Sequence, residues 1–270
     1  MGMQINTNVA ALTAYRNLNS TQNSLSKSLE KLSSGFRINR ASDDAAGLTI
    51  SETLRSQISG LRVAARNAQD GISVVQTAEG ALTEVHSLLH RQRDLSVQYA
   101  NGSLSTAAKA AIEAEIDQIG DEVARIAGAA EFAGVKLLDG TTASLTFQVG
   151  ANSTDTISVN LADITGATFT AIDSAAVVAD KTDLTKIDAA ITAVSTARSG
   201  LGASQNRFES TINSLNVTSE NLAAAESRIR DTDMAQEMAS FTRSNILSQA
   251  GTAMLAQATQ ASQGVLKLLG

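Results

Sequence analysis

Residues 187–229 read IDAAITAVSTARSGLGASQNRFESTINSLNVTSENLAAAESRI, and an apolar residue recurs there every seven positions. The repeat consists of Ile187, Val194, Leu201, Phe208, Leu215, Leu222 and Ile229. A strict seven-residue repeat is typical of a helix that packs in a left-handed coiled coil. We therefore expect one long helix from about Thr182 that packs against other long helices.

Apolar residues at helical spacing also run through both flanks of this stretch. One stripe spans Asn8–Leu32, a longer one spans about Asp44–Tyr99, and a third lies between Ile112 and Ile126. This spacing places the apolar side chains on one face of a helix. A last stripe, rich in Ala, follows beyond Asp233. The chain should therefore be dominated by helices from one end to the other.

The period changes to two in the middle of the chain, between about Thr141 and Asp173. Apolar and polar residues alternate over residues 145–149 and again over 157–161. The polar and glycine-containing linker at 150–155 suits a hairpin loop. This pattern predicts a small β insert between helical segments.

The composition favours long, closely packed helices. The chain has no Pro and only 3% aromatic residues, and each interior proline would cost a helix about 3 kcal/mol. We expect a mainly α fold in which long helices form a coiled-coil-like bundle with a small β-hairpin region at about 141–173. The N- and C-terminal helices should pair as a coiled coil. The domains expected are an inner core domain of residues 1–43 with 235–270, and a helical middle domain of residues 44–234.

Few residues offer catalytic or ligand chemistry. The absence of Cys excludes disulfides, thiolate metal sites and cysteine nucleophiles. His86 and His90 lie one helical turn apart, a spacing that can hold a metal, but we favour the interpretation that they are two surface histidines. Neither a Gly-x-Ser-x-Gly elbow nor a phosphate-binding glycine loop is present. We expect no enzyme activity, no catalytic residues, no cofactor and no metal.

The charge pattern excludes two further classes of partner. The net charge is -6, with both signs spread along the chain, so the basic stripe that nucleic acid requires is missing. No apolar run reaches the roughly 18 residues of a membrane span. We expect neither a nucleic acid nor a membrane as partner.

Each end of the chain carries an incomplete apolar stripe, which Gln22 interrupts at the N-terminal end. At about 25 cal/mol per Å² such a two-helix seam buries too little to offset the ordering of about 70 residues at 1–2 kcal/mol each. Neighbouring copies would supply the missing burial, and a contact whose rotation does not close produces a helical filament. The expected terminal assembly seam consists of Ile5, Val9, Leu12, Leu18, Leu25, Leu29, Leu32, Leu247, Met254, Val265, Leu268 and Leu269.

Several long motifs resemble those of bacterial flagellins. In chain order they are QINTN at 4–8, LSSGFRINRASDDAAGL at 32–48, AQDGIS to EGAL at 68–82, FAGVKLL at 132–138 and the C-terminal run from AMLAQA at 253–258 to Leu269. The likeness covers about residues 3–140 and 180–270. With only about 40 residues between these two regions, the chain resembles a minimal flagellin without the large outer domains.

The resemblance implies a structural subunit that polymerises with itself into the flagellar filament for swimming, secreted to the outside of the bacterium. It further implies an export chaperone, the flagellar type III export apparatus, and hook-associated and cap proteins as partners. One alternative is a hook–filament junction protein, which shares both terminal motifs, but the complete motif at 33–48 and the short middle favour the filament. An alternative of another class is a cytosolic helical binding module that stays monomeric.

The resemblance also implies contact with innate immune receptors. A helix patch read by the Toll-like flagellin receptor would comprise Arg91, Leu95, Gln98 and Glu115, and the same patch is expected to pack against the next subunit. The C-terminal residues Val265, Leu266, Leu268 and Leu269 resemble the tail sensed by cytosolic innate receptors.

Overall fold

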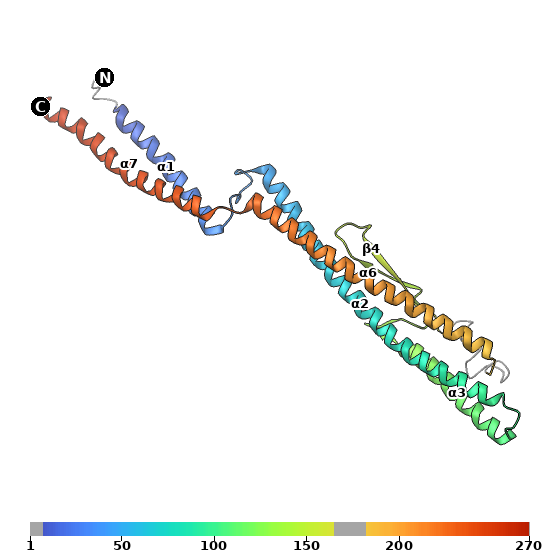
Figure 1. The fold of residues 1–270 in the computed structure, drawn as a ribbon. Helices are drawn as coiled ribbons and strands as arrows, with labels where there is room; N and C mark the ends of the chain where they lie inside the picture. Colours follow the sequence, from blue (N-terminus) through green and yellow to red (C-terminus); the bar gives the residue numbers. More distant parts are fainter. Residues whose placement is uncertain (1–7, 165–181, 270) are drawn as a thin grey trace. The chain divides into compact units, whose positions relative to one another are not determined.

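The computed structural model describes residues 8–164 and 182–269, with side chains described up to residue 260. In chain order the helices are α1 (Val9–Ser34), α2 (Ala45–Tyr99), α3 (Thr106–Ala129), α6 (Leu184–Arg230) and α7 (Met234–Leu269) (Figure 1). The strands β1 (Glu131–Phe132), β2 (Val135–Lys136), β3 (Ser144–Gln148) and β4 (Thr156–Asn160) lie between α3 and α6. The mainly α fold and the helical segments expected from the sequence are confirmed.

The chain forms two compact units. Unit 1 consists of Met1–Ser56 and Asn221–Gly270, and unit 2 consists of Gln57–Glu220. The boundaries fall inside α2 and inside α6. The inner and middle domains expected from the sequence, with boundaries at residues 43 and 235, stay a prediction.

In unit 1, α1 packs against α7 along its length (Figure 1). The two helices run antiparallel, because Asn8 near the start of α1 bonds Ala258 near the end of α7 and Lys31 pairs with Glu237 at the opposite end. The Asn8 side chain also accepts the backbone N–H of Ala11 at 3.0 Å, which caps the helix. The expected pairing of the terminal helices is confirmed.

The core of unit 2 is built on the seven-residue repeat of α6. Five members of the repeat are buried, from Ile187 to Leu215. The first four, Ile187 to Phe208, pack with apolar residues of α2, α3 and the strands. The ring of Phe208 contacts the ring of Phe147 on β3 in a T-shaped arrangement with centroids 5.5 Å apart. Because every seventh residue faces inward, a single stripe of α6 closes the core of this unit.

Two antiparallel hairpins accompany the helices of unit 2. In the longer one, β3 pairs with β4, and Ile157 and Val159 point inward from alternate positions. This hairpin was expected from the sequence; the part of the expected β insert at 165–173 lies outside the described residues. The shorter hairpin, β1 with β2, was not expected. Its two turn residues, Ala133 and Gly134, have φ of 49° and 82°, the left-handed values that a tight type I′ hairpin turn requires.

Candidate functional site

The contact between α1 and α7 combines small and polar side chains with a few large apolar ones. Half-buried or buried positions follow a spacing of three and four on both helices, as in a coiled coil. On α1 they are Ala11, Ala14, Leu18, Thr21, Leu25, Ser28 and Leu32, and on α7 they are Glu237, Phe241, Ser244, Ser248, Gly251, Leu255 and Ala258. A Cβ added to Gly251 would lie 3.2 Å from Cδ1 of Leu18, so the Leu18 side chain packs directly against the glycine. Nine of the fourteen seam residues are small or polar. This inner seam therefore buries little apolar surface for its length.

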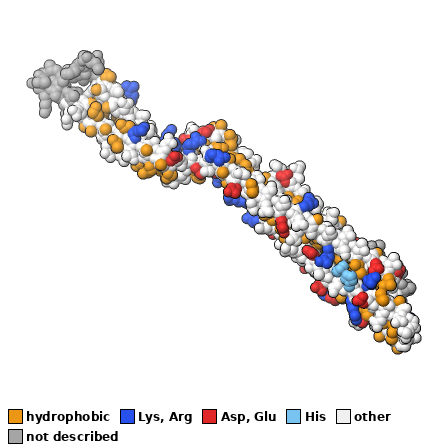
Figure 2. All heavy atoms as spheres, viewed as in Figure 1, with side chains coloured by type: hydrophobic (Ala, Val, Ile, Leu, Met, Phe, Trp, Pro, Cys, Tyr) orange, Lys and Arg blue, Asp and Glu red, His pale blue; other side chains and the backbone are white. Residues whose placement is uncertain are grey.

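Large apolar side chains lie on α1 and α7 outside the inner seam. Val9 is 60% exposed, Leu12 is 53% exposed, Leu247 is 52% exposed and Met254 is 65% exposed. The terminal helices also expose Tyr15, Leu29, Met234, Met238 and Ile246. Figure 2 shows apolar side chains gathered over these helices. We call this set of nine exposed residues the outer apolar face.

The expected terminal assembly seam divides between these two surfaces. Leu18, Leu25 and Leu32 belong to the inner seam between α1 and α7. Five others lie on the outer apolar face: Val9, Leu12, Leu29, Leu247 and Met254. Ile5 and the side chains of Val265, Leu268 and Leu269 lie outside the described part of the chain. Five of the expected seam residues are therefore exposed to solvent in the single chain.

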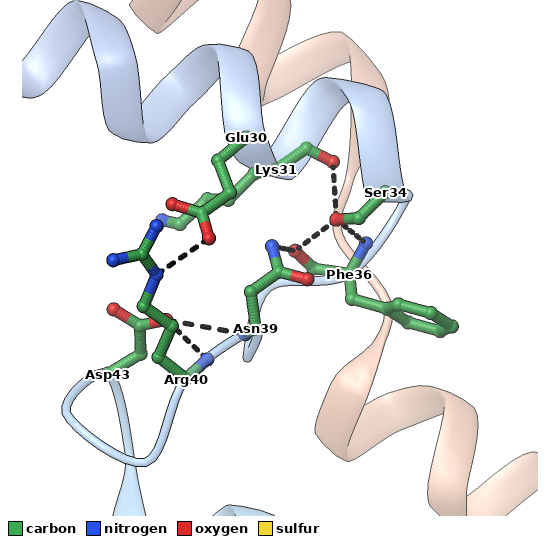
Figure 3. Close-up of polar contacts among 7 residues, drawn as sticks. All are labelled: Glu30, Lys31, Ser34, Phe36, Asn39, Arg40 and Asp43. Carbon is green, nitrogen blue, oxygen red and sulfur yellow. Dashed lines mark hydrogen bonds and ion pairs between the residues drawn. The ribbon is translucent and has the colours of Figure 1, made fainter.

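Polar contacts hold the loop between α1 and α2 in a fixed form (Figure 3). Asp43 Oδ2 accepts the backbone N–H groups of Arg40 at 3.0 Å and Asn39 at 3.3 Å. Arg40 Nε donates to Glu30 Oε1 at 2.8 Å, which ties the loop back to α1. The hydrogen bond from the backbone of Arg40 lowers the pKa of Asp43, and the hydrogen bond to Glu30 raises the pKa of Arg40. Asp43 therefore closes the loop, whereas Asp44 caps α2 by accepting the N–H of Gly47 at 2.8 Å.

The same loop is joined to the connection between α6 and α7 in unit 1. The backbone N–H of Arg37 donates to the Arg230 carbonyl at 2.6 Å, and that of Thr232 donates to the Gly35 carbonyl at 3.0 Å. The Arg230 guanidinium lies 4.8 Å from the centroid of the Phe36 ring and also pairs with Glu52 at 2.8 Å. We call this arrangement the loop tie. Sequence reasoning missed it, because it joins residues far apart in the chain, and the motif at 32–48 was its only signal.

The expected helix patch on α2 and α3 is only partly at the surface. Arg91 Nε and Nη2 both donate to Glu115 Oε1, at 2.9 and 2.6 Å. Arg91 and Gln98 are exposed and Glu115 is half-buried. Leu95 is 3% exposed and belongs to the core of unit 2, so it does not share the exposed surface with Arg91. The helix turns its apolar face inward at this position, and the spacing of four from Arg91 did not reveal that.

The histidine pair is brought together but is poorly suited to a metal. His86 Nε2 and His90 Nε2 lie 3.0 Å apart. A histidine that ligates a metal usually donates its other N–H to an acceptor, but Nδ1 of His86 is buried without a hydrogen-bond partner. In the part of the chain that the structure describes, no three His, Asp or Glu side chains gather as a metal site would require. Among the same described residues, no helix has both the length and the apolar character needed to cross a membrane.

The sequence is similar to those of known proteins over nearly the whole chain. Residues 5–143 match the bacterial flagellin N-terminal helical region and residues 184–269 match the bacterial flagellin C-terminal helical region. The chain is 53% identical to a flagellin of Halalkalibacterium halodurans and 50% identical to a flagellin of Bacillus subtilis. It is 46% identical to the flagellar filament 33 kDa core protein of Treponema phagedenis. Each of these matches covers 99% of this chain and 100% of the relative.

Proposed function

Because the chain belongs to the bacterial flagellin family, we propose that it is the structural subunit that polymerises into an extracellular flagellar filament for swimming. Flagellin is a family of structural proteins, and we propose no enzyme activity for this chain. The relatives include a protein named as a filament core protein, which supports the filament role. Self-association would be the central activity.

The outer apolar face is the observation that carries this proposal. Most of the large, strongly exposed apolar side chains of the described residues lie on α1 and α7, and burial of each such side chain is worth about 1.5–3 kcal/mol. The inner seam between the two helices uses other positions and leaves these side chains exposed. Neighbouring copies of the chain would cover this face in a helical polymer.

A charge placed on the outer apolar face tests the assembly role. We expect Leu12→Lys and Met254→Lys each to prevent elongation from filament seeds, measured by electron microscopy and light scattering. Thr13→Lys is the matched control, because Thr13 is exposed beside Leu12 and its side chain only bonds the Val9 carbonyl. Normal elongation by both Leu12→Lys and Met254→Lys would defeat the proposal.

Removal of either end gives a second test of the same idea. Deletion of residues 1–34 or of residues 238–270 removes one member of the α1–α7 pair and part of the outer apolar face. We expect unit 2 to stay folded by circular dichroism while elongation is lost. Growth of filaments by either truncated protein would show that the terminal helices are dispensable.

Further partners follow from the family as proposals. An export chaperone and the type III export apparatus would meet the terminal helices before assembly, and hook-associated and cap proteins would meet the ends of the polymer. The exposed outer apolar face supports such contacts, because it is uncovered in the single chain. The alternative of a hook–filament junction protein is separated by seeding, since a junction protein would add a short segment rather than extend a filament.

We further propose that the exposed part of the α2 patch in monomers is recognised by the Toll-like flagellin receptor. The ion pair of Arg91 and Glu115, with Gln98 on the same helix as Arg91, supports this role, whereas buried Leu95 would not make contact. Arg91→Ala should weaken binding of the receptor ectodomain to monomers. Arg125→Ala is the control, because Arg125 forms an equally exposed pair with Glu122 on α3. Equal binding by the wild type and Arg91→Ala would contradict the proposal.

A further inference from the structure

The methionines of the described part of the chain lie on one helix and are exposed. They are Met234, Met238 and Met254 of α7 (Figure 1), with exposed fractions of 48%, 50% and 65%. All three belong to the outer apolar face. The other two of the five methionines, Met1 and Met3, lie outside the described residues. Thioether sulfur is thus concentrated on the surface to which we assign self-association.

The packed regions of the described chain contain no methionine. The buried core of unit 2 consists of Ala, Val, Ile, Leu and Phe. The inner seam between α1 and α7 consists of Ala, Leu, Phe, Gly, Ser, Thr and Glu. A chemical change confined to Met234, Met238 and Met254 would therefore leave both packed regions intact and alter only the outer apolar face.

Oxidation by peroxide is the chemical change to which these side chains are most susceptible. The chain has no Cys and no Trp, so no thiolate reacts first, and an exposed thioether meets peroxide without any opening of the fold. Hydrogen peroxide transfers one oxygen to sulfur: the S–O bond forms, the O–O bond breaks, the sulfur loses two electrons, and the other oxygen leaves with both hydrogens as water. The product, methionine sulfoxide, is polar where the thioether was apolar.

Each of the three sulfurs has an exposed apolar neighbour on its own side of α7. Met234 and Met238 are one helical turn apart, and Met254 lies two turns from Leu247, which is also exposed. Residues four or seven positions apart lie on the same side of a helix. One sulfoxide would therefore interrupt a pair of apolar side chains, and three would interrupt the outer apolar face near both ends of the described part of α7.

We propose that Met234, Met238 and Met254 form an oxidation site that controls self-association, because sulfoxides at these positions disfavour the addition of a monomer to the filament. The inference rests on the assembly role proposed above, since it requires a neighbouring copy to cover the outer apolar face. A sulfoxide oxygen in that contact is an acceptor buried among apolar side chains, which weakens the contact. Subunits already in the filament are protected, because their sulfurs are covered. Sulfoxide reductases return the thioether, so the block is reversible.

The rate of oxidation in monomer and filament tests whether the site is accessible only before assembly. Dilute full-length monomer and preassembled filaments are treated with hydrogen peroxide, and peptide mass spectrometry counts the oxygen atoms gained at each methionine. We expect all three side chains to react in the monomer as fast as methionine in a short unstructured peptide. In filaments they should react about tenfold more slowly, since a covered sulfur reacts only when the contact opens. Equal rates in the two forms would overturn the proposal.

Elongation from unoxidised seeds tests the effect on assembly. Monomer in which all three methionines are oxidised is freed of peroxide with catalase and added to the seeds. The elongation rate should fall at least about tenfold, the factor by which one unpaired buried polar group weakens an association, while circular dichroism stays unchanged. Treatment with sulfoxide reductases A and B should restore the rate. Full-rate elongation by the oxidised monomer, or no recovery after complete reduction, would overturn the proposal.

A variant that combines Met234→Leu, Met238→Leu and Met254→Leu is the matched control. Leucine keeps the volume and the apolar character of methionine but has no sulfur, whereas Met1 and Met3 remain in this variant. Its elongation rate should be the same before and after peroxide treatment. A loss equal to that of the wild type would assign the effect to other residues and overturn the site.

The oxidation site and the assembly role fail in different ways. An untreated wild type that does not elongate from seeds contradicts the assembly role itself. An untreated wild type that elongates, together with an oxidised wild type that elongates equally fast, contradicts only the oxidation site.

Discussion

The ring of Phe208 lies against the backbone of Gly71, so that a Cβ added to Gly71 would come within 2.7 Å of Phe208 Cζ. The glycine on α2 thus makes the space that the largest core residue of α6 occupies. Phe208 is fully buried and contacts Phe147 of β3. The absence of a side chain at Gly71 therefore allows Phe208 of α6 to pack against α2 and β3 at the same time.

Gly71→Ala should lower the free energy of unfolding of unit 2 by about 1–3 kcal/mol, because the added methyl group overpacks the core. The gain of up to about 1 kcal/mol in helix propensity opposes this only partly. Gly80→Ala on the same helix is the control, since nothing lies within 4 Å of a Cβ there, and it should be stabilising. Urea denaturation of both variants measures the difference in the free energy of unfolding. Equal effects would show that the Phe208 ring can shift to accommodate the methyl group without a loss of stability.

Arg230→Gln should open the loop tie. Arg230 has a side chain only 13% exposed, pairs with Glu52 and lies over Phe36, so its loss should cost about 1–2 kcal/mol. Arg55 also pairs with Glu52, but its side chain is 54% exposed, and exposed pairs contribute little. Hydrogen exchange at the amides of Arg37 and Thr232 should therefore accelerate in Arg230→Gln and stay nearly unchanged in Arg55→Gln. Equal exchange in the two variants would mean that the backbone hydrogen bonds maintain the loop tie without help from the Arg230 side chain.

Asp43→Asn should loosen the loop between α1 and α2. The carboxylate accepts two backbone N–H groups, and these bonds lower its pKa in the folded chain. The folded chain thus holds the carboxylate charged at a pH where the unfolded chain has taken up a proton. The contribution of Asp43 is complete above the ordinary carboxyl pKa and is lost as the pH falls through the lowered value.

NMR of the Asn39 and Arg40 amides at a series of pH values measures this behaviour. Their chemical shifts should change below the ordinary range for Asp in the wild type, and the change should be absent in Asp43→Asn. Asp70→Asn, an exposed change on α2, is the control and should leave the transition in place. A midpoint at the ordinary value would show that the two hydrogen bonds do not favour the charged form.

Local sequence patterns predicted the helices and the longer hairpin well, because the periodicity of a helix or a strand is visible within a short stretch of sequence. The repeat from Ile187 to Phe208 correctly predicted the residues that α6 contributes to the core of unit 2. The hairpin of β1 and β2 escaped prediction, since two-residue strands show no period and its only signal was Ala133-Gly134. The loop tie escaped as well, because a contact between Phe36 and Asp231 depends on how the chain folds back.

The phase of the terminal helices was the harder problem. The sequence placed Val9, Leu12 and Leu18 together in one terminal assembly seam, but it did not show which of them α7 covers within one chain; the α1–α7 contact uses the face that carries Ala11, Ala14 and Leu18, and Val9 and Leu12 stay exposed. The contact face is the one on which apolar, small and polar residues recur at a spacing of three and four on both helices, and apolar content alone does not identify it. The burial of Leu95 has a similar origin, since position relative to the core, and not spacing from Arg91, decides its exposure.

Gly251→Ala should stabilise the α1–α7 pair in the monomer. Alanine is favoured over glycine within a helix by about 1 kcal/mol, and the only side chain that its Cβ would meet is the flexible end of Leu18, at 3.2 Å. A shift of Leu18 by a few tenths of an ångström accommodates the methyl group. Hydrogen exchange of amides in α1 and α7 should slow in the dilute variant, while exchange in unit 2 stays unchanged. Faster exchange in the two helices would mean that the inner seam tolerates no added volume and that Gly251 is required for the close approach.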